Sequence, residues 1–207
     1  NKVFIPWIKA QYGRGAEVAS LCIGAFLLAG TGLLDGKECA THWLAASEFR
    51  ELYPEVKLID DKIITDEEGL YTSGGAYSSL NLNLYLVEKF AGRDMAILSS
   101  KIFEIDMGRF SQSPFIIFKG QKAHDDTVVL TAQEYIEQHY RDKITVDKLA
   151  EQLAVSRRTF ERRFKKATSN TVIEYVQRVK VEAAKKALEK GRKTVSEIMY
   201  DVCYNDP

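Results

Sequence analysis

Six basic side chains and one acid crowd the short stretch from Ser156 to Lys166. Arginine and lysine pair with phosphate oxygens, and arginine can also form two parallel hydrogen bonds with guanine. Thr145 and Ser156 are good helix N-cap residues, and they divide this region into a short helix, a tight turn and a basic second helix. That pattern is typical of a helix-turn-helix, so it indicates DNA as the partner. The alternative is a solvated helix face that binds nothing.

Apolar spacing indicates that this basic stretch belongs to a folded domain. Phe160 and Phe164 are four residues apart on the second helix, so both rings face the same side. The first helix carries an apolar stripe at three- and four-residue spacing, formed by Val146, Leu149, Ala150 and Leu153. The second helix can therefore bury two aromatic rings while most of its arginines face outward.

A second candidate for chemistry is Cys22, which is flanked by the small residues Ser20 and Gly24. Small neighbours permit a sharp strand-to-helix turn that projects the central side chain, and a helix N-terminus favours the thiolate. His42 follows another short strand and would complete a Cys–His pair for nucleophilic catalysis. The alternatives are a buried cysteine that packs beneath the sheet and a core or interface histidine.

The run Ser73-Gly74-Gly75 is a third candidate, because glycines let backbone N–H groups approach a ligand or an anion closely. It can equally be the turn that begins the next helix. The chain has three cysteines, and Cys39 and Cys203 carry no motif. An odd number at irregular spacing argues against a disulfide framework or a zinc site. We expect no metal and no cofactor.

Periodicity predicts strands and helices before residue 105 and only helices after 127. The predicted strands are 56–60, 62–65 and 70–73, with a turn at 66–69. The predicted helices are 76–90, 94–105 and 128–140. The first of these is apolar on most sides, which is typical of a helix buried against a sheet. Residues 106–126 lose any period and are predicted to be a linker, part of which docks on a domain.

Charge divides the chain in the same place. Residues 1–126 hold 13 basic and 17 acidic residues, whereas residues 127–207 hold 16 and 12. This asymmetry supports a sensor or scaffold half joined to a nucleic-acid-binding half. No apolar run is long enough to predict a membrane helix, so we expect a cytoplasmic protein that does not bind membranes.

The run SRRTFERRFKKATSNTVIEYVQRVKVEAAKKALE resembles the first helix-turn-helix of the AraC/XylS family and the long helix after it. TVSEIMYDVCY resembles the first helix of the second unit in that family. The resemblance implies two recognition helices in successive major-groove segments. We expect the chain to be part of a longer protein, because its second recognition helix and first strands are not identifiable, and to bind DNA weakly as it stands.

Residue by residue, the resemblance implies two kinds of DNA contact. Base-edge contacts are expected from Arg158, Glu161 and Arg162. Positions near phosphates are expected for Arg157, Thr159, Arg163 and Lys166. A phosphate contact or a surface ion pair is the alternative for any single arginine.

The segments ASLCIGAFLLAGTGLLDGKECATHW and GLYTSGGAYSSLNLNLYLVEKFAG resemble the PfpI-type, class I glutamine-amidotransferase-like domain. That superfamily uses a cysteine, a histidine and an acid for hydrolysis or related chemistry. Ile23 stands where peptidase-like members carry histidine, and no acidic partner is identifiable. We therefore expect a ligand-sensing or dimerising domain, with ligand-pocket candidates Cys22, His42, Ser73, Gly74 and Gly75, and no enzyme activity.

Together these observations predict an α/β, flavodoxin-like sandwich sensor domain, incomplete, followed by an all-α helix-turn-helix domain. The expected boundaries are 1–105 for the sensor, 106–126 for the linker and 127–207 for the DNA-binding domain. The predicted function is sequence-specific transcriptional regulation through double-stranded DNA, by a homodimer with an unknown small-molecule effector. The alternative is a cysteine-dependent hydrolase or amidase that uses Cys22 and His42.

Overall fold

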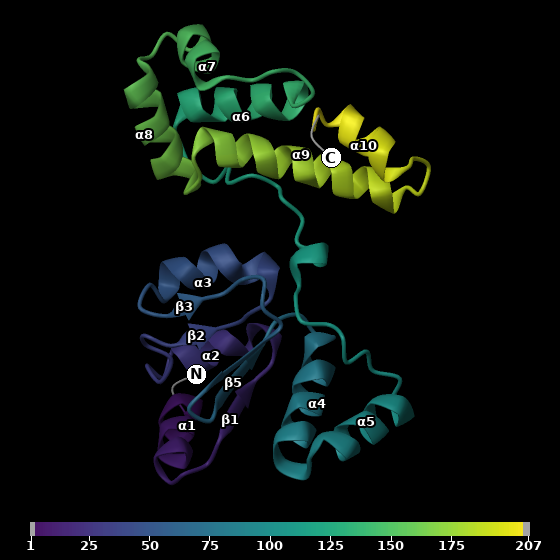
Figure 1. Ribbon diagram of the computed structural model, residues 1–207. Coiled ribbons are helices and arrows are strands. Elements are labelled where there is room, and N and C mark those ends of the chain that lie inside the picture. The colour runs from purple at the N-terminus through teal and green to yellow at the C-terminus, as the bar shows by residue number, and fades with distance from the viewer. Residues whose placement is uncertain (1–2, 205–207) are drawn as a thin grey trace. The chain divides into compact units, whose positions relative to one another are not determined.

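The computed structural model describes residues 3–204, so the outer ends of both expected domains, 1–2 and 205–207, lie outside the described residues. The chain divides into two compact units between Ile116 and Ile117. Figure 1 shows the first unit as a small sheet with helices and the second as a group of helices. The division lies within the segment 106–126 that the sequence predicts to be a linker.

Strand β5 (Leu70–Ser73) is the centre of the first unit, and all four of its residues are buried. It pairs in parallel with β1 (Val18–Ser20) and antiparallel with β4 (Ile64–Glu67), which gives the order β1-β5-β4. A second parallel pair joins β2 (Glu38–Cys39) to β3 (Lys57–Leu58). Strands covered on both faces carry few exposed polar side chains, which fits the buried sequence of β5.

The turn between β4 and β5 is shorter than the expected turn at 66–69. Asp66 pairs with Tyr71 and Glu67 pairs with Leu70, so the ladder continues to a two-residue turn. Both turn residues, Glu68 and Gly69, have positive φ, as a tight hairpin turn requires. The expected strands 56–60 and 62–65 have the wrong bounds. Strand pairing, rather than the local sequence, sets where these strands begin and end.

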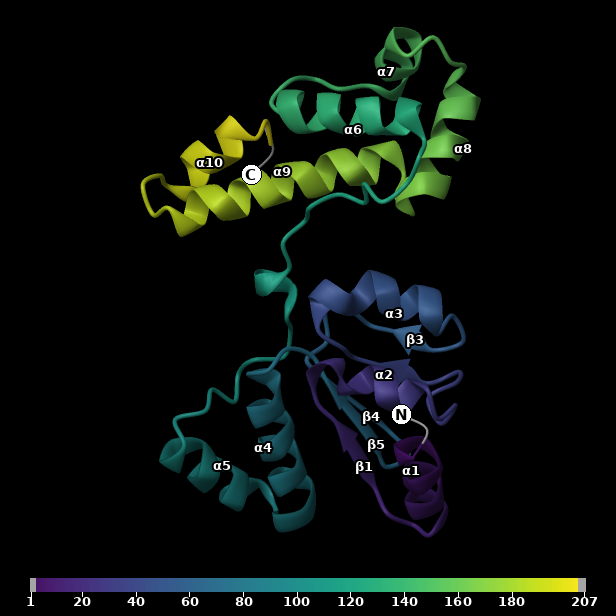
Figure 2. The same ribbon diagram turned by 180° about the vertical axis from the view of Figure 1, so that it is seen from behind.

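Helices cover both sides of this sheet. On one side lie α4 (Ser78–Ala91) and α5 (Arg93–Ile102), and on the other lie α1 (Phe4–Gly13), α2 (Ala25–Ala29) and α3 (Ala46–Leu52), as Figures 1 and 2 show. The main core of the unit lies among α2, α3 and the strands, where Leu28, Leu34 and Phe49 are almost fully buried.

Helix α4 is less buried than its composition predicts. Leu82 and Leu84 are buried, but Leu80 and Phe90 are exposed. The helix therefore buries one face only. Helix α5 ends at Ile102, three residues before the expected end at 105, because Glu104 adopts a positive φ that a helix does not allow. Helix α1 was not among the predicted elements.

The second unit contains α6 (Thr127–His139), α7 (Val146–Gln152), α8 (Arg157–Thr168), α9 (Val172–Glu189) and α10 (Val195–Asp201). Figure 2 shows α6 lying along α9, with α7 and α8 at one end and α10 folded back at the other. Its core is formed by buried apolar residues from α6 to α9, among them Ile136, Leu149, Phe160, Phe164 and Tyr175.

Candidate functional site

Both helices of the helix-turn-helix in the second unit begin where the sequence predicts. The side chains of Thr145 and Ser156 accept hydrogen bonds from Lys148 N and Thr159 N, so both residues are N-caps. The turn between α7 and α8 contains Ala154 in a left-handed conformation, with φ of 53°. Alanine rarely adopts this conformation, so no residue type in the turn predicts it. The result is a tight connection between the two helices.

Two aromatic rings hold α8 in place. Phe160 and Phe164 have no exposed surface, and their ring centroids lie 5.6 Å apart in an edge-to-face arrangement. The ring of Tyr175, from α9, packs edge-to-face on Phe164 at 5.3 Å. Such pairs add to the stabilisation that burial alone provides. The inward face of α8 is thus occupied by core packing, and the remaining faces are open to a partner.

The outward side chains of α8 fall into two groups. Arg157 pairs with Asp147 at 3.0 Å and with Glu161 at 3.3 Å. Arg163 forms two hydrogen bonds with Asp126, of 2.7 and 2.8 Å, and the Arg163 side chain holds the pKa of that carboxyl below its ordinary value. Because Asp126 also caps α6, this second pair ties α8 to the start of α6.

The second group is free of such contacts. Within residues 3–204, Arg158, Arg162 and Lys166 are exposed and form no ion pair with another side chain. Arg158 and Arg162 are four residues apart and therefore share one face of α8. Thr159 is half-buried because its hydroxyl contacts the capping residue Ser156 at 2.9 Å. An anionic partner can therefore bind at the face of α8 that carries this unpaired positive charge.

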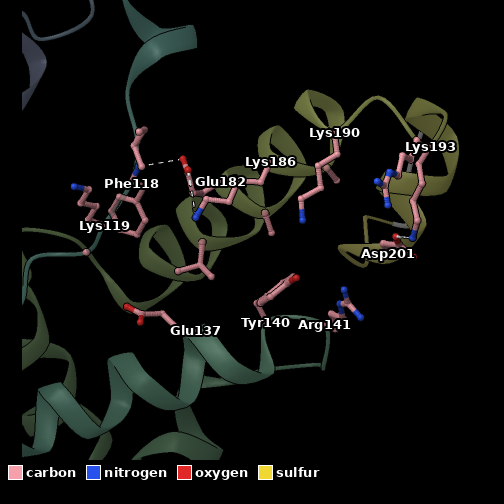
Figure 3. Close-up of a pocket in the computed structure, with 16 residues that line it drawn as sticks. Phe118, Lys119, Glu137, Tyr140, Arg141, Glu182, Lys186, Lys190, Lys193 and Asp201 are labelled. Atoms are coloured by element: carbon pink, nitrogen blue, oxygen red, sulfur yellow. Dashed lines mark hydrogen bonds and ion pairs between the residues drawn. The ribbon is translucent and has the colours of Figure 1, made fainter.

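A hollow of about 660 Å³ adjoins this face, between residues 123–126 and the side chains of Arg162, Arg163 and Lys166. A second, of about 720 Å³, lies between α6, α9 and α10, and Figure 3 shows its lining. There the buried Glu182 accepts a hydrogen bond from Phe118 N at 3.0 Å and lies 3.7 Å from Lys186. This buried carboxylate fixes the start of the second unit onto α9.

In the first unit, Cys22 occupies the sharp turn that its small neighbours predict. It lies two residues after the end of β1, begins the 3-10 turn Cys22–Gly24 before α2, and has a φ of 55°. A positive φ at a non-glycine residue is costly and is found preferentially at functional positions. The thiol is half-buried, whereas the neighbouring Ile23 is 63% exposed.

The other candidate residues of this unit lie close to Cys22. The Thr41 hydroxyl donates to Cys22 O at 3.1 Å, which joins the turn after β2 to the turn after β1. The ring of His42 lies against Gly75, where an added Cβ would be 3.4 Å from His42 Cδ2. We call Cys22, His42 and residues 73–75 the strand-end site, because they follow the ends of β1, β2 and β5.

The strand-end site is not an assembled Cys–His pair. His42 Nδ1 accepts a hydrogen bond from Leu44 N at 3.1 Å, so this nitrogen does not donate to a carboxylate. No hydrogen bond joins the Cys22 thiol to His42 among the described residues. A catalytic base is normally oriented by a third group at its far nitrogen. The geometry lacks that orienting group.

One N–H group of the run Ser73-Gly74-Gly75 is already used within the fold. Gly74 N already donates to Ile63 O at 3.0 Å, so it is not available to an anion. Ser73 is fully buried, and its hydroxyl has no hydrogen-bond partner. The polar atom that this run contributes is therefore the Ser73 hydroxyl.

Sequence reasoning missed Gln112, which lies in the expected linker. Its side chain is 1% exposed, and Nε2 donates to Thr41 O at 2.9 Å and to Lys62 O at 3.0 Å. A Cβ on Gly74 would approach the Gln112 amide within 2.9 Å or less. A glutamine in an aperiodic polar segment gives no signal of burial, because its partners are distant backbone carbonyls.

Within residues 3–204, no group of three potential metal ligands is found, and no helix is long and apolar enough to cross a membrane. Burial raises the pKa of the Cys39 thiol to about 11, so this cysteine is a core residue.

Comparison with known proteins finds a match for part of each unit. Residues 1–89 match the DJ-1/PfpI family, and residues 149–207 match a helix-turn-helix domain. The regulator GbdR of Pseudomonas aeruginosa is 24% identical over 94% of this chain and 53% of its own length. The regulator CdhR of the same species is 24% identical over 98% of this chain and 60% of its own length. The chain thus spans a little over half the length of these relatives.

An enzyme also matches the first unit. Isonitrile hydratase of Pseudomonas putida is 31% identical over 45% of this chain and 40% of its own length. The α/β unit has the flavodoxin-like fold of the DJ-1/PfpI family, and the helical unit is of the type found in AraC-type regulators. The chain therefore combines a DJ-1/PfpI domain with an AraC-type helix-turn-helix domain.

Proposed function

We propose that this chain is a sequence-specific, DNA-binding transcriptional regulator in which α8 enters the major groove. One observation carries the proposal: α8 buries Phe160 and Phe164, while Arg158, Arg162 and Lys166 are exposed and have no ion-pair partner among the described residues 3–204. An arginine that is exposed and has no ion-pair partner breaks no contact within the protein when it binds a base edge. The regulators that match most of this chain support the same function.

The proposed division of labour on α8 follows the resemblance to the AraC/XylS family. We assign base-edge reading to Arg158, Glu161 and Arg162. Phosphate contacts are assigned to Arg157, Thr159, Arg163 and Lys166. The pair between Arg157 and Glu161 is exposed on both sides, and exposed pairs are weak. Glu161 is therefore available to accept from cytosine N4.

The test is binding of the chain to a pool of promoter fragments at several salt concentrations. Specific binding is expected, with log affinity falling by about 0.9 per phosphate contact against log salt. Arg162→Ala should lower the preference for one base pair, whereas Lys166→Ala should weaken binding to all sequences equally and reduce the salt slope. Arg14→Ala, an exposed change in the first unit, is the matched control. Equal weak binding to all fragments by the unaltered protein would contradict the proposal.

The first unit supplies the control of this activity. Residues 1–105 sense a small molecule at the strand-end site, residues 106–126 connect the units, and residues 127–207 bind DNA. Buried polar atoms without a partner support a ligand at this site, because Ser20 and Ser73 each have a hydroxyl with no hydrogen bond. A homodimer, the cytoplasm and an unidentified effector complete the proposal. Sedimentation of the protein with and without DNA tests the dimer.

A cysteine-dependent hydrolase or hydratase is the second candidate function. The strained φ of Cys22 and the similarity of the first unit to isonitrile hydratase favour it. The hydrogen bond from Leu44 N to His42 Nδ1 argues against it. Turnover of a simple alkyl isonitrile that disappears in Cys22→Ala would support this candidate. DNA binding that persists unchanged in Cys22→Ala would count against thiol chemistry in the mechanism.

A further inference from the structure

Residues 106–112, which we call the strap, follow α5 and run back to the strand ends. The strap is attached at its beginning by Asn81, whose Nδ2 donates to Asp106 O at 2.7 Å. It is attached at its end by Gln112 N, which donates to Asp61 O at 2.7 Å. Ser111 Oγ also donates to Asp61 O, at 3.0 Å. These hydrogen bonds attach the two ends of the segment to the rest of the first unit.

The end of the strap is also a wall of the strand-end site. Gln112 Nε2 donates to Thr41 O, next to His42, and its amide packs directly on Gly74. One buried side chain thus contacts two of the three turns that form the site. Anything that enters the site between these turns must contact Gln112 or replace it.

Several buried polar atoms in the strap or bonded next to it lack a hydrogen-bond partner. Six buried side-chain polar atoms among residues 3–204 have no hydrogen-bond partner, and three of them are Asn81 Oδ1, Arg109 Nε and Gln112 Oε1. Such groups are rare in native proteins, and each raises the free energy of the state that buries it. A hollow of about 420 Å³ lies beneath the strap, lined by Met107, Arg109 and Phe110 together with β4 and α4. The unsatisfied polar atoms favour a change in the position of the strap, and the hollow leaves space for it.

The chain beyond the strap is fixed in the second unit. Phe118 N donates to Glu182 at 3.0 Å, and the Phe118 ring packs on Tyr175 at 5.1 Å. The chain from Gln112 to Phe118 can span at most about 20 Å. If the strap were released, the attachment would begin near Asp106, and the maximum span would rise to about 40 Å.

We propose that the strap is a latch by which occupancy of the strand-end site controls the reach of the helix-turn-helix unit. A ligand group with at least two N–H donors replaces Gln112 Nε2 at Thr41 O and Lys62 O, and the strap leaves the sheet. The longer attachment changes how two DNA-binding units of a dimer engage their half-sites, since effective concentration depends on linker length. The last step rests on the proposed regulator function, whereas the latch itself does not.

Three variants of the full chain test the latch without requiring the ligand. Gln112→Ala removes both side-chain hydrogen bonds, and Gly74→Ala displaces the Gln112 amide while leaving Gln112 in place. Gly13→Ala, at the end of α1, is the matched control, because its new Cβ would meet nothing within 4 Å. The readouts are hydrogen exchange of the amides of the strap and cleavage by trypsin after Arg109.

In both test variants, exchange in the strap should be faster by about ten- to a hundredfold, the factor expected from the loss of two hydrogen bonds, and cleavage should accelerate in parallel. The control should match the unaltered protein. Unchanged exchange in Gly74→Ala would overturn the latch, even if Gln112→Ala fails to fold. DNA binding by the unaltered protein tests the regulator function separately. Faster exchange with DNA affinity equal to that of the unaltered protein would overturn the coupling.

Discussion

Replacing Tyr175 by phenylalanine isolates one buried hydroxyl in the core of the helical unit. The Tyr175 hydroxyl donates to Glu137 Oε1 at 2.7 Å and accepts from Gln133 Nε2 at 3.2 Å. Gln133 Nε2 keeps a second acceptor, Gln121 O at 2.9 Å, and Glu137 keeps its pair with Lys122. The variant therefore loses a hydrogen bond to a carboxylate, and one of the two N–H groups of Gln133 Nε2 loses its acceptor. A loss of about 2 kcal/mol in the free energy of unfolding is expected.

Urea denaturation can assign this loss to one unit. Both tryptophans, Trp7 and Trp43, lie in the first unit, so their fluorescence reports only that unit, whereas the far-ultraviolet circular dichroism reports both. A loss of about 2 kcal/mol moves the urea midpoint by about 1 M. The dichroism of Tyr175→Phe should show this shift, and the fluorescence transition should not move.

Tyr135→Phe is the matched control, because Tyr135 packs on the same core and stacks on His139. If both variants lose the same free energy, the hydroxyl of Tyr175 contributes nothing specific and the reasoning is wrong. The pH dependence gives an independent check. Burial and Glu137 raise the pKa of Tyr175 above its ordinary value. The stabilisation is therefore complete below about pH 10 and is lost as pH rises further, so the difference between Tyr175→Phe and the unaltered protein should shrink there.

Three other predictions concern single residues. Arg162→Ala should relax sequence preference by about 1–3 kcal/mol at one base pair, measured by competition between operator variants, and an equal loss for all sequences would make base reading by Arg162 wrong. Gly120→Ala should cost at least about 2 kcal/mol, because φ is 70° and the new Cβ would run into Tyr175 Oη; an unchanged urea midpoint would contradict this. The Cys39 thiol, with a pKa of about 11, should resist iodoacetamide at pH 8 until urea unfolds the first unit, and rapid labelling of the folded protein would show that Cys39 is not buried.

Local patterns predicted the elements whose partners are near in sequence. The N-caps Thr145 and Ser156 bond to amides three residues further along the chain, and Phe160 and Phe164 need only helical spacing to share a face. The turn at Cys22 followed from its small neighbours. In each case the spacing itself fixes the geometry.

The parts that sequence could not predict depend on distant partners. The Gln112 side chain donates to backbone carbonyls that are 71 and 50 residues away in the sequence. Asp126 accepts from Arg163, which is 37 residues further along the chain. No local rule distinguishes such polar residues from exposed ones. Strand bounds failed for the same reason, because pairing with β5 decides where β4 begins and ends.

The two kinds of contact on α8 have a consequence for how its specificity can change. Phe160 and Phe164 fix the helix in the core, and the pair between Arg163 and Asp126 ties it to α6. Arg158 and Arg162 take no part in either contact, so substitutions there alter the outward surface without disturbing the fold. A helix built in this way can acquire a new operator preference through exposed positions alone. In the proposed DNA complex, the residues that set the position of α8 are not those assigned to base edges.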